Sequence, residues 1–154
     1  MEYENPPAES TIATQGIVVN RVFTKPETSV YDMFAYDLRT STIRNPDGSV
    51  VFDMKNIEVP KQWSQIATDI LAQKYFRKAG VPEVGSESSI KQVVHRMVGC
   101  WTDWGTKFGY FNSSKDSKAF YEEMAFILLN QMGAPNSPQW FNTGLNYAYG
   151  ITGN

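Results

Sequence analysis

The chain has 154 residues, of which 42% are apolar and 14% aromatic, and 14 Lys and Arg against 16 Asp and Glu give a net charge of −2. This length and apolar content suit one folded domain and exclude an intrinsically disordered protein. The balanced charge provides no electrostatic footprint for nucleic acid or for an anionic membrane, so we expect no direct nucleic-acid binding and no membrane binding.

The N-terminal residues 1–16 are rich in Glu, Pro, Ser and Thr and have no periodicity, which predicts a flexible arm. They lack the apolar core of a secretory signal, and no apolar stretch approaches the roughly 18–20 residues that cross a bilayer. We therefore expect a cytoplasmic protein. After the arm, the β-branched residues 17–19 indicate a short strand between Gly16 and Phe23.

A β-hairpin is predicted over about residues 36–54. Its turn is Asn45-Pro46-Asp47-Gly48, in which proline sets φ and glycine tolerates a positive φ. The flanking segments 40–43 and 50–52 have the composition of strands.

Three amphipathic helices are predicted after the hairpin, over about residues 60–79, 88–104 and 116–132, because apolar residues recur there at three- and four-residue spacing. Pro60 suits the first turn of the first helix, and Gly105 is expected to end the second. We interpret the adjacent Glu122 and Glu123 as a solvated face of the third helix. Residues 17–133 are thus predicted to form a mainly α domain with a small β-hairpin, of the α+β class.

The chain has one cysteine and one histidine, which restricts its chemistry. Cys100 cannot form an internal disulfide, and it lies beside the apolar stripe of the second helix, where a small buried side chain is expected. His95 lies about 140° around that helix from Cys100, at roughly 100° per residue. We therefore predict no metal site and no catalytic residue, and we interpret His95 as a polar helix position.

The most suggestive segment is Asn136-Ser137-Pro138-Gln139-Trp140-Phe141-Asn142. Two prolines at 135 and 138 are expected to prevent a helix and to hold the backbone extended. Exposed N–H and hydroxyl groups in such a segment suit recognition of a phosphate or a sugar. An ordinary helix-to-strand connection is the alternative that the residues leave open.

This segment, continued by Thr143-Gly144, resembles the passage from the helical N-terminal region into the catalytic barrel of class II, adenosylcobalamin-dependent ribonucleotide reductases. The resemblance covers roughly residues 17–150. Its upstream motifs, in order, are Tyr31-Asp32-Met33-Phe34, Val51-Phe52, Val59-Pro60-Lys61-Gln62-Trp63-Ser64-Gln65, Lys74-Tyr75-Phe76 and Trp104-Gly105-Thr106-Lys107-Phe108-Gly109-Tyr110-Phe111.

The resemblance implies a substrate-binding role for one short segment. Ser137 stands where reductases contact the bound nucleotide, and the side chains that would shape the same wall are Asn136, Trp140, Phe141 and Asn142. Residues 134–154 would begin the first strand of an α/β barrel that is missing from a truncated chain. The aromatic residues Trp63, Tyr75, Phe76 and Trp104 would be packing residues of the helical region.

The family's chemistry, as the resemblance implies it, is a thiyl radical reaction that adenosylcobalamin initiates and that uses at least three cysteines. This chain has one, and Cys100 matches none of the catalytic positions. We therefore expect a fragment or a split-gene piece that is inactive alone, with no cobalamin site assignable to its residues. Its partners would be the remainder of the reductase chain and, through the full site, a ribonucleotide, in a parent that could be a homodimer. The alternative is a free-standing interaction or regulatory module with the reductase N-terminal fold.

Overall fold

The computed structural model describes residues 15–153. Its elements are the 3-10 turn η1 (Val30–Met33), strands β1 (Tyr36–Arg44) and β2 (Val50–Pro60), helix α1 (Gln65–Ile70), the π-helical turn η2 (Leu71–Tyr75), and helices α2 (Ile90–Lys107), α3 (Ser114–Leu129), α4 (Ser137–Asn142) and α5 (Leu145–Tyr149). The predicted α+β class is confirmed. The arm predicted over residues 1–16 lies almost wholly outside the described residues.

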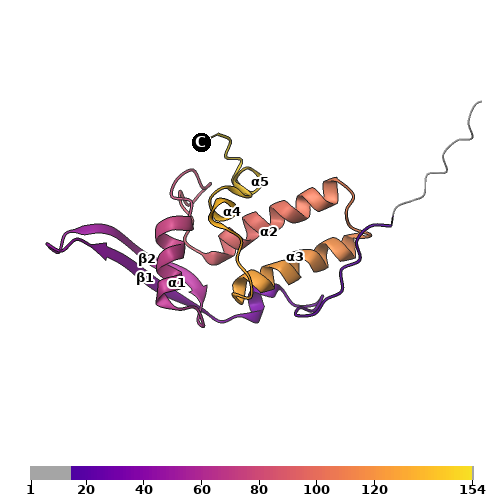
Figure 1. Ribbon diagram of the computed structural model, residues 1–154, viewed down its shortest axis with the longest axis horizontal. Coiled ribbons are helices and arrows are strands. Elements are labelled where there is room, and N and C mark those ends of the chain that lie inside the picture. The colour runs from indigo at the N-terminus through magenta and orange to yellow at the C-terminus, as the bar shows by residue number, and fades with distance from the viewer. Residues whose placement is uncertain (1–14, 154) are drawn as a thin grey trace, which may run out of the picture.

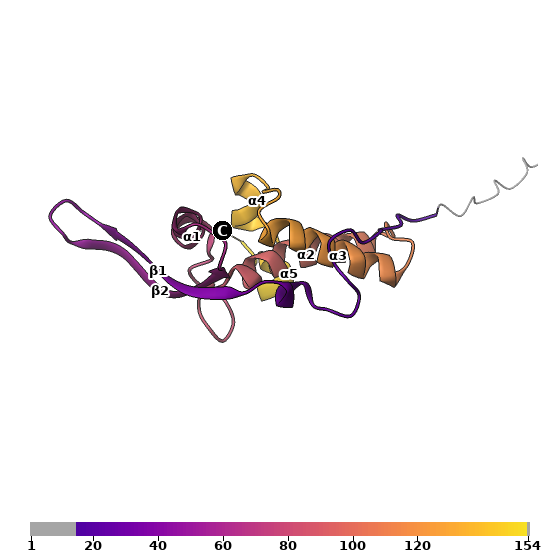
Figure 2. The ribbon, with the colours of Figure 1, turned by 90° about the horizontal axis from the view of Figure 1, so that it is seen from below.

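The predicted hairpin is present as the antiparallel pair β1–β2, which runs from Tyr36 opposite Pro60 to Arg44 opposite Val50. Its turn is closed by a 2.9 Å hydrogen bond from the Gly48 N–H to the Asn45 carbonyl. Gly48 has a φ of +85°, which favours glycine. The end of the hairpin that carries this turn extends away from the helices (Figures 1 and 2).

The helix predicted over residues 60–79 is shorter than expected. Pro60 ends β2, past the predicted limit of 54, and does not open a helix. Helix α1 begins only at Gln65, where the Ser64 hydroxyl accepts a 3.1 Å hydrogen bond from the Ala67 N–H and caps the first turn. The helical path then widens into η2 and ends at Tyr75. This end places the Tyr75 ring against α4.

Helices α2 and α3 pack along each other and form the main helical layer (Figure 1). A capping box between Ser89 and Gln92 fixes the start of α2. Gly105 was expected to end this helix but lies inside it, and the absence of a side chain leaves room for the Phe111 ring, which packs where a Cβ would stand. Trp104, expected to be a packing residue, is 50% exposed.

The N-terminal segment 17–24, which we call the strap, lies along α3. The strand predicted here is absent apart from a single bridge between Ile17 and Phe111. Three acidic side chains of α3 hold the strap. Asp116 accepts a 2.9 Å hydrogen bond from the Val19 N–H, and Glu122 forms an ion pair with Arg21.

Glu123 makes the most extensive contact with the strap. Its carboxylate accepts hydrogen bonds of 2.7–3.2 Å from three consecutive backbone N–H groups, residues 22–24, and from the Thr24 hydroxyl. The predicted solvated face is therefore wrong, since Glu122 and Glu123 are each only 8% exposed. Glu123 is buried because it supplies acceptors to a backbone segment that has no sheet to pair with, and Glu122 is buried against the Arg21 guanidinium of the same segment.

The hydrophobic core lies between the base of the hairpin, α1, α2 and α3. Its buried members include Val30, Ile57, Val59, Trp63, Leu71, Phe76, Ile90, Val93, Val94, Met97, Val98, Leu128, Leu129 and Trp140. Helices α4 and α5 pack on α2. No helix within residues 15–153 is both long enough and apolar enough to cross a membrane.

Candidate functional site

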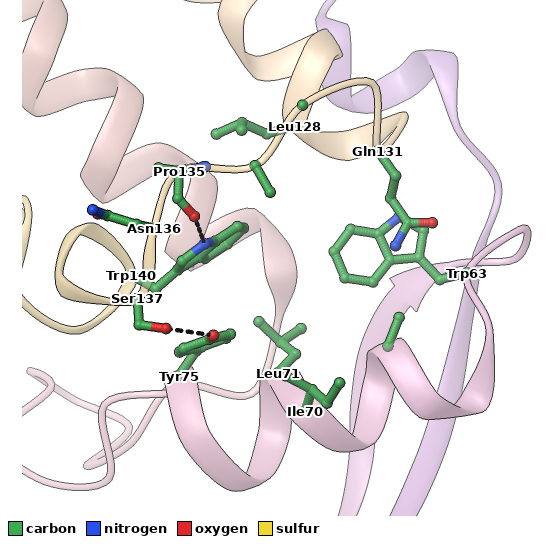
Figure 3. A pocket seen from close by; sticks show the side chains of 13 residues that line it. Trp63, Ile70, Leu71, Tyr75, Leu128, Gln131, Pro135, Asn136, Ser137 and Trp140 are labelled. Atoms are coloured by element: carbon green, nitrogen blue, oxygen red, sulfur yellow. Dashed lines mark hydrogen bonds between the residues drawn. The ribbon is translucent and has the colours of Figure 1, made fainter.

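A cavity of about 500 Å³ opens between α1, the C-terminal end of α3 and the segment that leads into α4 (Figure 3). Its wall is mostly apolar, with polar side chains from Asn136 and Ser137 at one side and from Gln131, beside Trp63, at the other. The lining residues are Trp63, Ala67, Ile70, Leu71, Tyr75, Leu128, Gln131, Gly133, Ala134, Pro135, Asn136, Ser137 and Trp140. A concave, largely apolar wall with few polar groups is typical of a small-molecule site.

The backbone of the candidate segment is helical from Ser137 to Asn142, so the predicted extended conformation is wrong there. Pro138 stands in the first turn of α4, where the missing N–H of proline costs no intrahelical hydrogen bond. Asn136 precedes the helix with extended dihedral angles, so Pro135 lies before the helix and Pro138 lies in its first turn. Within residues 134–153, the described part of the predicted barrel start, the regular elements are helices.

Tyr75 and Trp140 position the start of α4. The Tyr75 hydroxyl lies 3.0 Å from the Ser137 hydroxyl, and its ring stacks on Trp140 with 5.4 Å between centroids. The Trp140 indole N–H donates a 2.8 Å hydrogen bond to the Pro135 carbonyl, so the segment is closed on itself (Figure 3). These contacts direct the Ser137 hydroxyl toward the cavity rim.

The five candidate substrate-binding residues do not share one cavity. Asn136, Ser137 and Trp140 line the cavity described above. Phe141 and Asn142, one turn further along α4, line a different pocket together with Lys74 and Arg77. The structure thus divides the predicted wall into two, with Tyr75 common to both pockets.

Arg96 holds α4 in place, and sequence reasoning missed it. Its guanidinium forms a 2.6 Å ion pair with Glu87, and both side chains are completely buried. Its two terminal nitrogens donate to the carbonyls of Trp140 (2.7 Å) and Thr143 (2.9 Å). These carbonyls belong to the C-terminal end of α4, where backbone acceptors lack helical partners. The sequence offered no local signal for this role, because Arg96 lies outside the apolar stripe of α2 at about 100° per residue.

Glu87 gathers the surrounding chain around the same ion pair. It accepts hydrogen bonds from the Arg77 N–H at 2.7 Å and from the Tyr149 hydroxyl at 2.8 Å. Burial and the adjacent Glu87 charge raise the pKa of Tyr149 above its usual value. Gly144, with a φ of +82°, passes so close to the Arg96 carbonyl that a Cβ would overlap it. Arg96 and Glu87 therefore fix the path of the chain from α4 through α5.

The single histidine and cysteine have no shared function in the structure. The His95 Nδ1 lies 2.8 Å from the Tyr121 hydroxyl, and burial of part of the ring lowers its pKa. Cys100 is buried, as expected, and burial followed by the Asp103 charge raises the pKa of its thiol. Among residues 15–153, no cluster of three His, Cys, Asp or Glu side chains could hold a metal ion.

The residues present do not fit a cobalamin. The cavities described above have volumes of about 400–500 Å³, and a further one, beside Cys100, has about 710 Å³. Volumes of this order suit ligands of drug size, whereas a corrin ring with its nucleotide tail is much larger.

Substitutions of Tyr75 should distinguish the contribution of its ring stacking to stability from the contribution of its hydrogen bond. We expect Tyr75→Phe to lower the free energy of unfolding by less than about 1 kcal/mol, because the bond to Ser137 is solvent-exposed. Tyr75→Ala should cost about 2–3 kcal/mol, since it also removes the packing against Trp140 and Phe141. Urea unfolding followed by circular dichroism measures both. Equal losses would contradict the importance of the stack.

Comparison with known proteins places the chain in a family. A family model described as class II vitamin B12-dependent ribonucleotide reductase matches residues 37–131. The vitamin B12-dependent ribonucleotide reductase of Bradyrhizobium diazoefficiens is 48% identical over 88% of this chain, and that of Agrobacterium fabrum is 45% identical over 88%. The corresponding enzyme of Rhodopirellula baltica is 39% identical over 77% of the chain.

The chain is much shorter than these relatives. It covers 13% of the length of the first two and 11% of the third. The family match includes the hairpin and helices α1 to α3, which carry most of the core that supports the Ser137 cavity. This chain therefore belongs to the class II, vitamin B12-dependent ribonucleotide reductase family and corresponds to an N-terminal region of those enzymes.

Proposed function

We propose that this chain forms part of the substrate-binding wall of an enzyme that reduces ribonucleotides to deoxyribonucleotides for DNA synthesis. The observation that carries the proposal is the start of α4, where Ser137 and Asn136 border a largely apolar cavity of about 500 Å³. The Ser137 hydroxyl can donate and accept hydrogen bonds at the rim of this cavity. Such a rim suits the phosphate or ribose of a nucleotide.

In this proposal the chain is inactive alone, and the remainder of a cytoplasmic reductase chain supplies the catalytic residues, with a second copy of the parent as a possible partner. The reaction would be a thiyl radical mechanism that adenosylcobalamin initiates. Cys100 supports the assignment of the catalytic residues to the remainder of the reductase, because it is the only cysteine of this chain and is buried in α2. A buried thiol with a raised pKa is a poor redox group.

The test is Ser137→Ala in a complete reductase that contains this region. We expect the KM for the ribonucleotide to rise about tenfold, as the loss of one hydrogen bond to a charged ligand predicts, with a smaller change in kcat. Ser114→Ala, at the exposed start of α3, is the matched control and should leave the KM unchanged. An unchanged KM in the Ser137 variant would refute the substrate contact.

The inactivity of the isolated chain has its own assay. The purified 154-residue chain, mixed with adenosylcobalamin, a dithiol and ribonucleotides, should give no deoxyribonucleotide, because only one cysteine is present. Turnover by the chain alone would overturn the argument from the cysteine count.

The second candidate function is a free-standing interaction or regulatory module. The closed core between the hairpin base and α1 to α3 favours it, since these elements bury their apolar faces without further chain. Trp104, Phe108 and Tyr110 are exposed aromatic residues, and they favour the reductase piece instead. Exposed aromatic rings close together are typical of a surface that another part of a larger protein buries. Strong binding of a hydrophobic dye by the purified chain would support the reductase piece, and a monomer without dye binding would support the module.

A further inference from the structure

The C-terminal end of α3 has a backbone geometry that favours glycine. The Met132 N–H donates a 2.9 Å hydrogen bond to the Ile127 carbonyl. The Gln131 N–H donates a 3.2 Å hydrogen bond to the Leu128 carbonyl. These two bonds form a Schellman motif, in which the residue after the C-cap is left-handed and is usually glycine. That residue is Gln131, whose φ of +54° strains the backbone at a position where a glycine would not.

The Gln131 side chain lines the same cavity that Ser137 borders. It lies beside Trp63, on the side of the cavity opposite Ser137 (Figure 3). Among residues 15–153, its amide has no hydrogen-bond partner, although the residue before it, Asn130, accepts a 3.4 Å hydrogen bond from Gln62. The donor and the acceptor of the Gln131 amide are therefore free to bind a ligand in the cavity.

The wall between Gln131 and Ser137 is largely apolar. The Trp63 indole N–H donates a 2.8 Å hydrogen bond to the Leu129 carbonyl, so Trp63 offers a ligand only its ring. Leu71 adds aliphatic surface to the same wall. A planar heterocycle suits such a wall, because its faces pack against apolar groups and its polar edge pairs with a donor and an acceptor at the end of the cavity.

We propose that Gln131 binds the polar edge of the nucleobase of the ribonucleotide whose phosphate or ribose contacts Ser137, an inference that rests on the proposed function. Each of the four bases has hydrogen-bond donors beside acceptors on this edge. A primary amide exchanges its donor and its acceptor by rotating half a turn, so it can pair with each base. Gln131 therefore lets one cavity accept all four ribonucleotides, and this contact accounts for a strained residue where glycine would fit.

The first test is Gln131→Gly in a complete reductase that contains this region. We expect the KM for every ribonucleotide to rise about tenfold, as the loss of two neutral hydrogen bonds predicts, with a smaller change in kcat. The same substitution relieves the strain at position 131, so the purified 154-residue chain should unfold at a temperature about 2–4 °C higher. A side chain with only a structural role would not combine a higher KM with higher stability.

The second test is Gln131→Glu, which examines the contact with the base edge. A carboxylate only accepts hydrogen bonds. Guanine presents two neighbouring N–H donors on this edge, whereas adenine presents one donor beside an acceptor. We therefore expect the KM for the adenine ribonucleotide to rise about fivefold more than the KM for the guanine ribonucleotide. Gln15→Glu, at an exposed glutamine outside the cavity, is the matched control for the added charge and should leave the ratio of the two KM values unchanged.

The base contact and the proposed function fail in different ways. If Ser137→Ala raises the KM and Gln131→Gly does not, the base contact is wrong and the contact of Ser137 stands. If neither variant changes the KM, both are wrong. A lower unfolding temperature in Gln131→Gly, or an unchanged ratio of KM values in Gln131→Glu, would also overturn the base contact.

Discussion

Arg96→Met should lower the free energy of unfolding by about 3–5 kcal/mol, the largest effect we expect from a single substitution in this chain. The variant leaves Glu87 buried without its partner charge and leaves the carbonyls of Trp140 and Thr143 without their donor. Urea unfolding measured by circular dichroism gives the free energy. Lys107→Met is the matched control, because its ion pair with Asp103 is exposed and should contribute little to the free energy of unfolding.

A second substitution at the same ion pair tests the cause. If the buried, unpaired carboxylate is responsible, Glu87→Gln in the Arg96→Met background should recover about 1–2 kcal/mol. The same variants should alter the surroundings of Trp140, whose carbonyl Arg96 binds, and near-ultraviolet circular dichroism reports this change. No recovery in the double variant would show that lost packing, and not charge, causes the instability.

Glu123→Gln should destabilise the chain by about 2 kcal/mol, because a charged acceptor of backbone hydrogen bonds becomes neutral. The carboxylate serves the N–H groups of Val22, Phe23 and Thr24 and also the Thr24 hydroxyl. Glu27→Gln, an exposed residue just after the strap, provides the control and should change stability by less than about 0.5 kcal/mol. An equal loss in the two variants would contradict the role of the strap.

The same carboxylate should make stability depend on pH in the acid range. Burial raises the pKa of Glu123, but the hydrogen bonds from Thr24, Phe23 and Val22 outweigh it, and the net pKa lies below the usual value of 4.5. A group whose folded pKa is lowered stabilises the fold above its unfolded pKa and loses this contribution as the pH falls through the folded value. The parent chain should therefore lose stability below about pH 4.5 more steeply than Glu123→Gln. Parallel curves of unfolding free energy against pH would contradict this assignment.

The fold was predictable where the signal is local. The hairpin turn follows from Pro46 and Gly48, and helix α2 follows from its apolar spacing and its serine cap. The errors occurred where a tertiary contact replaced a local preference. Gly105 lies inside α2, where the absence of a side chain leaves room for Phe111, and Pro60 ends a strand opposite Tyr36.

The candidate site was predictable only in part. Ser137 and its neighbours stood out as a motif, and the structure places Asn136, Ser137 and Trp140 at one cavity. The extended backbone inferred from two prolines was wrong, because a proline in the first turn of a helix fits as well as one in a loop. The separation of Phe141 from Ser137 follows from this helix, since residues four apart lie one turn apart along it.

The sequence by itself determined the α+β class, the hairpin turn, the main helices and the resemblance to the reductase family. Each of these depends on the spacing of residues within a short segment. Only the tertiary structure decided which polar groups are buried together. Arg96 binds carbonyls 44 and 47 residues away, and Glu123 binds a strap 99–101 residues away. Such partners leave no local pattern, because a buried charge is matched by whichever unpaired backbone groups the folded chain brings to it.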